Sequence, residues 1–143
     1  MSFTGNYMCT SFKREVLTGI HNFTTTTGSV YKMALYTAAA TFTAATTDYT
    51  VTNETSGTNY VAGGEVLTNV TPTSSGTTAL TDFVDLVWST ASFTARGAII
   101  YNSTAGTNSV LILDFGSNQT SSAGDFTVIF PPADANNAII RIA

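Results

Sequence analysis

The hydrophobic pattern near the N-terminus has a helical period. Apolar residues recur three and four positions apart over residues 10–20, which predicts a short amphipathic helix. Thr10 or Ser11 could cap its first turn, and Gly19 lies near its expected end. About two to three turns are too few to be stable alone, so this helix must pack against the rest of the domain. Its apolar stripe consists of Phe12, Val16, Leu17 and Ile20.

After the helix the pattern alternates with period two, as expected for β-strands. In residues 29–36, Tyr31, Met33 and Leu35 share one face, and the residues between them share the other. Short segments of the same kind follow, separated by turns rich in Gly, Ser, Thr and Asn. The pattern predicts about seven or eight short strands in an all-β, antiparallel, jelly-roll-like β-sandwich. The further strand segments are residues 59–71, 78–89, 92–102, 109–116, 125–131 and 138–143.

Small and polar residues predict the loops between these strands. Residues 37–47 show no helical stripe and are expected to be irregular. The paired Gly63 and Gly64 suggest a bulge or a sharp bend. The segment Ser103–Ser109 has the composition of a hairpin turn, and Ser117–Gly124 that of another loop.

The chain is long enough for one independent core but carries few charges. Its 143 residues bury roughly two-thirds of the surface of the unfolded chain. Only 10% of the residues are charged, against about a quarter in average soluble domains. We find no internal repeat and no domain boundary, so residues 1–143 are predicted to form a single β-sandwich domain. Residues 1–9 would form an N-terminal arm before the helix.

Charge and hydropathy argue against nucleic-acid and membrane partners. A net charge of −4 and a pI near 4.5 leave no basic stripe for phosphates. The longest strictly aliphatic run, Val110–Leu113, is far shorter than the roughly 20 residues of a spanning helix. Its lack of alternation instead predicts a strand that is covered on both faces.

The N-terminus and the cysteine count suggest synthesis in a reducing cytoplasm. The first residues lack the basic start and apolar core of a signal peptide. The single cysteine, Cys9, cannot form an intramolecular disulfide and fits a reducing compartment. With no cysteine partner, Cys9 is expected to be a small buried hydrophobe.

The sequence offers little catalytic chemistry. His21 is the only histidine, whereas a triad needs a base beside a nucleophile and a zinc site needs several ligands. At the end of the predicted helix, His21 is expected to interact with free carbonyl groups. No P-loop, H-E-x-x-H or G-x-S-x-G motif occurs. We therefore expect no enzyme, no catalytic residue and no cofactor.

Four aspartates are candidates for metal ligands. Asp82 and Asp85 are three residues apart, so on a strand they would point to opposite faces. Asp114 and Asp125 flank the predicted loop and could approach each other across a hairpin neck, where calcium would find oxygen ligands. The spacing matches no EF-hand and Asp is common in turns, so we expect no metal site.

Arg96 is the one cation in the apolar segment Phe93–Gly116. It alternates with Phe93, Ala95 and Gly97, so it faces away from them. A long side chain there could lie along the sheet and pair with an acid on the neighbouring strand, such as Asp114. Its role is therefore predicted to be structural.

Three segments, in order, resemble a family of small tailed-bacteriophage proteins. They are "TNETSGTNYVAGGEVLTNVTPT", "DLVWSTASFTARGAIIYNS" and "LDFGSNQTSSAGDFTVIFPPADANNAIIRIA". The resemblance covers Asn53–Ala143, about two-thirds of the chain, and the helix-led N-terminal third looks like some podovirus-type members. Asn59 stands where many relatives would have glycine, so the turn before Tyr60 could differ.

The resemblance implies a virion structural protein with a small β-sandwich fold. Our leading hypothesis is a capsid decoration (cement) protein on the capsid surface. It would bind the outer face of the major capsid protein and neighbouring copies of itself, as a homo-oligomer and, as the resemblance suggests, a trimer.

Two alternatives remain open. The first is a tail adaptor or a tail or head fibre component, in which loops such as Thr41–Thr47 or Ser117–Gly124 contact a receptor or a neighbouring ring. The second, more remote, is a carbohydrate-binding module, which needs an exposed aromatic platform. The only tryptophan, Trp88, lies in an apolar strand pattern and is expected in the core.

The N-terminal arm is the candidate interface. Phe3, Tyr7 and Met8 precede every predicted element and could dock on a neighbouring subunit. The alternative is that these residues form a first strand or staple the helix to the domain.

Overall fold

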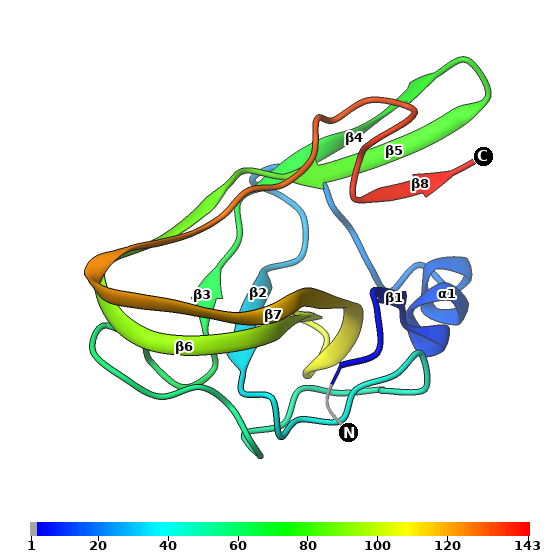
Figure 1. Ribbon diagram of the computed structural model, residues 1–143. Helices are drawn as coiled ribbons and strands as arrows, with labels where there is room; N and C mark the ends of the chain where they lie inside the picture. The colour runs from blue at the N-terminus through cyan, green and yellow to red at the C-terminus, as the bar shows by residue number, and fades with distance from the viewer. Residues whose placement is uncertain (1–2) are drawn as a thin grey trace.

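The computed structural model describes residues 3–143, which form two antiparallel β-sheets and one short helix (Figure 1). The large sheet has the strand order β1-β7-β6-β2-β3, and the small sheet the order β4-β5-β8. The predicted all-β antiparallel fold is therefore confirmed. In chain order the elements are β1 (Tyr7–Met8), α1 (Thr10–Leu17), β2 (Tyr31–Tyr36), β3 (Glu65–Val66), β4 (Asn69–Ser75), β5 (Thr78–Phe83), β6 (Leu86–Asn102), β7 (Asn108–Val128) and β8 (Ile140–Ile142).

A long hairpin of β6 and β7 forms the centre of the large sheet (Figure 1). The two strands contain 17 and 21 residues, so the prediction of uniformly short strands is wrong here. A turn at residues 103–107 joins them, as predicted for Ser103–Ser109. Ser117–Gly124, predicted to be a loop, lies inside β7.

Ser117–Gly124 is a strand because β6 supplies its partners. Thr94 pairs with Thr120, and their two hydroxyl oxygens are 2.8 Å apart in a hydrogen bond. The Ser121 hydroxyl donates a 3.0 Å hydrogen bond to the Ala91 carbonyl. Pairing across the sheet thus overrides the turn preference of small polar residues, which suit the solvent face of a strand.

The core covers both faces of the large sheet. Tyr31 stacks on Phe23 on one face of β2, with ring centroids 4.4 Å apart. Tyr36, of opposite parity, packs edge-on against Phe42 on the other face, at 4.6 Å. Residues 110–112 of β7 are also buried throughout and Leu113 is half-buried, so the prediction made for Val110–Leu113 is confirmed except at its last residue.

The small sheet lies across the large one and closes the core (Figure 1). Phe83, at the end of β5, packs against Tyr31 at 5.7 Å and against Phe130 at 5.6 Å between ring centroids. The chain then crosses from the small sheet to the large one through residues 84–85. The segment 78–89, predicted to be one strand, is therefore divided between two sheets.

α1 is shorter than predicted and begins differently. It ends at Leu17 rather than at residue 20, and Gly19 follows it with a φ of +77°. Cys9, not Thr10 or Ser11, occupies the N-cap position and makes no side-chain capping hydrogen bond. The first turn is instead tied to the domain, because the Thr10 N–H donates to the Ala44 carbonyl.

Only part of the predicted apolar stripe of α1 is buried. Phe12 lies in the core, and Glu15 is buried beside it. Leu17 and Ile20, which the pattern placed in the stripe, are exposed. The helix therefore presents apolar side chains both inward and outward.

Residues 37–64 form a long connection between β2 and β3. Residues 37–47 are irregular, as predicted. Gly63 and Gly64 have φ values of +96° and +76°, which confirms the predicted sharp bend. A Cβ on Gly64 would overlap the Met33 carbonyl, so this bend brings the loop into contact with β2.

Candidate interaction surface

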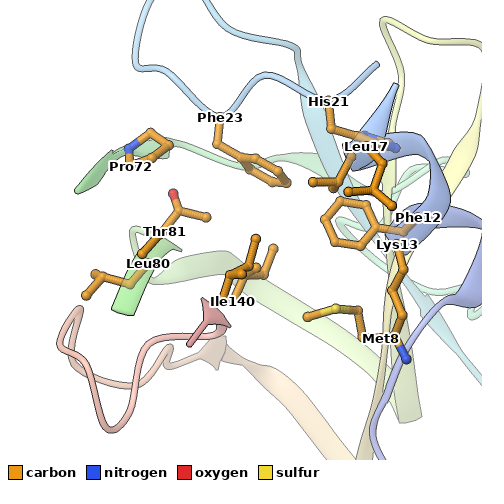
Figure 2. Close-up of a pocket in the computed structure, with 13 residues that line it drawn as sticks. Met8, Phe12, Lys13, Leu17, His21, Phe23, Pro72, Leu80, Thr81 and Ile140 are labelled. Atoms are coloured by element: carbon orange, nitrogen blue, oxygen red, sulfur yellow. The ribbon is translucent and has the colours of Figure 1, made fainter. Parts of the chain in front are cut away.

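An apolar groove of about 310 Å³ lies between α1 and the small sheet (Figure 2). Phe12 and Leu17 of α1 line one side, and Leu80 of β5 lines the opposite side. Ile140 of β8 and Met8 of β1 also line it, together with Phe23 and Pro72. The volume is at the lower end of the roughly 300–1,000 Å³ that is usual for binding sites.

The two periodicities of the sequence produce this groove. On β8, Ile140 and Ile142 point into the groove, while Arg141 lies on the other side of the strand. On α1, the pairs Phe12–Lys13 and Val16–Leu17 recur four residues apart and share the face that lines it. The groove thus exists because one helix face and one strand face remain uncovered.

The rim of the groove is apolar and carries one cation. Leu17 is 87% exposed and Ile142 is 58% exposed. Lys13 is the only Lys, Arg, Asp or Glu that lines the groove, and it has no ion-pair partner within residues 3–143. This surface therefore suits a partner that combines apolar side chains with an acidic group.

His21 joins α1 to the long hairpin behind the groove. Its Nε2 lies 2.6 Å from Glu15 Oε2 of α1, and its Nδ1 lies 3.1 Å from Asn102 Nδ2 of β6. The other Glu15 oxygen accepts a 3.1 Å hydrogen bond from Asn108 Nδ2 of β7. The prediction that His21 would serve the carbonyl groups at the helix end is wrong, because its ring nitrogens bind side chains.

The orientation of Asn102 determines which nitrogen of His21 carries the proton. Asn102 Oδ1 accepts hydrogen bonds from the backbone N–H groups of Thr104 and Ala105, at 3.0 and 3.1 Å. Its amide nitrogen must therefore face His21 and donate to Nδ1. A neutral His21 then carries its proton on Nε2 and donates it to Glu15. All polar atoms of this ring are used internally, so His21 is a structural residue.

The structure places Phe3, from the candidate arm, in the hydrophobic core. Phe3 is 4% exposed and packs edge-on against Phe42, with ring centroids 5.8 Å apart. Gly97 makes room for this ring, because a Cβ there would lie 2.5 Å from a Phe3 ring carbon. Phe3 is thus part of the fold of its own chain.

Tyr7 and Met8 form β1, the first-strand alternative that the sequence left open. They pair with Ile112 and Leu111 of β7 and are half-buried. The Tyr7 hydroxyl lies 2.7 Å from the Thr4 hydroxyl. Of the three candidate interface residues, Met8 alone lines the groove, and so only Met8 belongs to the candidate surface.

Cys9 is buried, as predicted. Its side chain is fully inaccessible, and burial raises the pKa of its thiol. A protonated and enclosed thiol is a poor nucleophile.

The aspartates do not form the arrangement considered for calcium. Asp114 and Asp125 lie in the same strand, β7, so no hairpin neck brings them together. Asp82 is buried, and its two oxygens accept backbone N–H groups of Phe83 and Ile139 at 2.8 and 3.3 Å. Burial raises the pKa of its carboxyl. No group of three or more potential metal-ligating His, Cys, Asp or Glu side chains occurs in the described part of the chain.

The predicted pairing of Arg96 with Asp114 is confirmed. The guanidinium Nη1 contacts Asp114 Oδ1 across the β6–β7 ladder, where both side chains are largely buried. Asp114 Oδ1 also accepts the N–H of Gly116 at 2.8 Å. Both charges are engaged within the sheet and neither is free for chemistry.

A second polar cluster, centred on Glu54, was missed by the sequence analysis. Glu54 Oε1 accepts hydrogen bonds from the Tyr60 hydroxyl at 2.6 Å and from the Gly63 N–H at 2.8 Å. Glu54 Oε2 accepts one from the Tyr49 hydroxyl at 2.7 Å. Burial, and then the neighbouring carboxylate, raise the pKa of Tyr60. The only signal in the sequence was that two tyrosines, Tyr49 and Tyr60, lie on either side of Glu54 in the loop.

Trp88 lies in the core, as predicted. It is 2% exposed and packs among Tyr60, Phe93 and Phe126.

Asn59, where glycine was expected in relatives, has a left-handed φ of +61°. Asn tolerates this region, and its side chain donates to the carbonyls of residues 89 and 90.

None of the described helices is long and apolar enough to cross a membrane. Comparison with known proteins shows no matching family model, no matching curated protein and no matching solved structure.

Proposed function

We propose that the protein is a bacteriophage virion structural protein, a capsid decoration protein that binds the outer face of the major capsid protein and stabilises the head. It would be made in the host cytoplasm and reside on the capsid surface, next to further copies of itself. Two independent lines support this proposal: the ordered resemblance over Asn53–Ala143 and the character of the molecular surface.

The observation that carries the proposal is the groove between α1 and β8. Large exposed apolar side chains at a concave site are typical of protein–protein contact surfaces. Leu17 and Ile142 sit on regular elements, so the surface is preformed and would lose little conformational entropy on binding. A decoration protein needs such a surface to stabilise the shell by binding its assembled form.

The side chains that could perform chemistry are engaged internally, which supports a non-enzymatic role. His21 is held by Glu15 and Asn102, Arg96 by Asp114, and Cys9 is enclosed. A role without cofactor, nucleic acid or membrane is part of the same proposal. The carbohydrate-binding alternative loses its best platform, because Trp88 is buried. The fibre alternative loses one of its two loops, because Ser117–Gly124 is a paired strand.

Immunogold electron microscopy of purified virions tests the proposal, with an antibody raised against this chain. We expect gold distributed over the head. Gold confined to the tail would contradict decoration and favour a tail component. Intact particles without label would contradict a surface role in the virion altogether.

A matched pair of variants links the location to the groove. Leu17→Asp places a charge on its exposed rim, and Val51→Asp places one on another exposed apolar residue, in the loop after β2. Leu17→Asp is expected to reduce head labelling strongly, and Val51→Asp to leave it near the wild-type level. Equal labelling of both variants would mean that the groove is not the capsid-binding surface.

A further inference from the structure

A second apolar surface with the opposite charge lies on the outer face of the β6–β7 hairpin. Val87 and Ile129 are exposed there, at 45% and 76%. Val87 pairs with Thr127 in the ladder, so residues of the same parity on both strands share this face. Asp125 has this parity on β7, whereas Asp85 and Ile129 each lie one residue beyond the paired ends Leu86 and Val128. Both aspartates are exposed. We call this the acidic face.

The two carboxylates of the acidic face are held in place and keep free acceptor capacity. Asp85 Oδ1 accepts the Phe130 N–H at 2.8 Å, and Asp125 Oδ1 accepts the Thr90 N–H at 3.1 Å. Neither has an ion-pair partner among the residues that the structure describes. Their positions are fixed by backbone contacts, so the face presents two ordered negative charges beside apolar side chains.

The groove complements this face in charge and in chemistry. It offers Leu17, Ile140 and Ile142 with the single cation Lys13. On a chain with a net charge of −4, an apolar surface whose only charge is positive is an exception. Two other cations are placed elsewhere: Arg96 is ion-paired with Asp114, and Lys32 lies near Gly63, toward the β3 edge of the large sheet.

The acidic face is separate from the groove. Figure 1 shows α1 on one side of the molecule and the bend of the β6–β7 hairpin on the other, and the start of β6 and the end of β7 run between that bend and the small sheet. No residue of the acidic face lines the groove, so the two surfaces do not meet within one chain. A second copy, however, supplies the acidic face to the groove of the first without any change of fold.

We propose that copies of this chain associate head to tail, with the acidic face of one copy (Asp85, Val87, Asp125 and Ile129) seated on the groove of the next around Lys13 and Leu17. Because the two contact surfaces differ, the interface is heterologous, and repetition closes a ring where the rotation permits. The inference concerns self-association of the free protein and does not require the virion role. Because the groove holds one occupant at a time, a second copy and the capsid would compete for it, and the association proposed here is that of the protein before it binds the head.

Charge exchange tests this interface with the purified full-length chain. Sedimentation velocity across a wide concentration range measures the dissociation constant. Lys13→Glu, and separately Asp85→Lys with Asp125→Lys, place like charges against each other, and each is expected to raise the dissociation constant at least about tenfold. The combined triple variant restores opposite charges and is expected to recover most of the association.

Two controls separate the interface from net charge. Arg14→Glu makes the same charge change on α1 outside the groove lining, and Glu65→Lys changes an exposed acid on β3, at the far edge of the large sheet. Both are expected to associate like the wild type, and circular dichroism verifies the fold of every variant.

Three results would overturn the proposal: a wild-type chain that is monomeric at all concentrations, a Lys13→Glu variant that associates normally, or a triple variant that does not recover. A monomer that still labels the phage head would refute this interface while leaving the proposed function intact. A monomer whose groove binds an alkyl carboxylate such as decanoate would instead identify a small amphipathic ligand as the occupant.

Discussion

At the scale of single residues, Glu54 organises the longest irregular part of the chain. Its carboxylate accepts hydrogen bonds from two tyrosine hydroxyls and from the N–H of Gly63. The Tyr60 hydroxyl in turn accepts the N–H of Leu35 in β2 at 2.8 Å. The loop between β2 and β3 is thereby bonded to the sheet through side chains. A buried network of this kind stabilises a fold only while every member has its partner.

Glu54→Ala should therefore be strongly destabilising. It leaves three buried or half-buried donors without their acceptor, each of which costs about 1–3 kcal/mol. We expect the free energy of unfolding to fall by roughly 3 kcal/mol. Urea unfolding followed by the fluorescence of the buried Trp88 measures it. Glu65→Ala, at an exposed acid, should change it by less than about 0.5 kcal/mol, and a similar value for Glu54→Ala would show that the network contributes little.

At the scale of elements, α1 is held by polar contacts as much as by its apolar side chains. Phe12 is its one buried aromatic residue, and Glu15 and His21 connect the helix to β6 and β7. Since an isolated helix of eight residues is unstable, these connections determine whether the wall of the groove exists.

Asn102→Ala tests this connection. The change removes the donor to His21 Nδ1 and the acceptor of two backbone N–H groups in the hairpin turn. We expect a loss of about 2 kcal/mol in stability. In the wild-type protein, nitrogen NMR should show the proton of neutral His21 on Nε2. A proton on Nδ1 would contradict the assigned hydrogen-bond pattern. For the stability measurement, Asn118→Ala, at an exposed position of β7, serves as the control.

The elements also show how far the sequence alone could lead. Alternation located β2, and uniform apolarity correctly indicated that residues 110–112 are covered on both faces. The polar half of β7 was missed because its Ser and Thr residues have turn propensity, and only the pairing with β6 makes them a strand. Residues 84–85 were read as part of one strand because nothing local marks the crossing between two sheets.

The candidate surface was predictable only in part. Met8 was identified from the sequence, but its partners in the groove come from α1, β5 and β8. Leu17 was expected to be buried, because helical spacing defines a stripe without defining how much of it the domain covers. The groove combines residues from distant segments, such as Lys13 and Ile140, which follows from the fold and leaves no local signature.

At the scale of the whole molecule, the N-terminal segment completes the core. Phe3 fills a space over Gly97, and β1 forms one edge of the large sheet. The arm is therefore integral to the domain that is described, rather than an appendage of it.

Phe3→Ala should lower the stability by about 3 kcal/mol, because it removes a buried aromatic side chain and leaves a cavity. Tyr7→Ala, at a half-buried position whose hydroxyl bonds to the exposed Thr4, should cost clearly less. Thermal unfolding of both variants provides the comparison. Equal melting temperatures for Phe3→Ala and the wild type would show that the arm does not belong to the core.

The long hairpin also sets an order of assembly for the chain itself. The paired residues nearest the turn, Asn102 and Asn108, are six positions apart in sequence (108 − 102), and the last pair, Leu86 and Val128, is 42 apart (128 − 86). Strand pairing can therefore proceed from the turn outward, with a small loop-closure cost at each step. Tyr7 must instead find Ile112, 105 residues away (112 − 7), and β8 must find β5 across the hairpin. Since the groove requires both Met8 and Ile140, it forms only when the two ends of the chain have docked. In the head-to-tail association proposed above, only a completely folded copy could therefore join its neighbours.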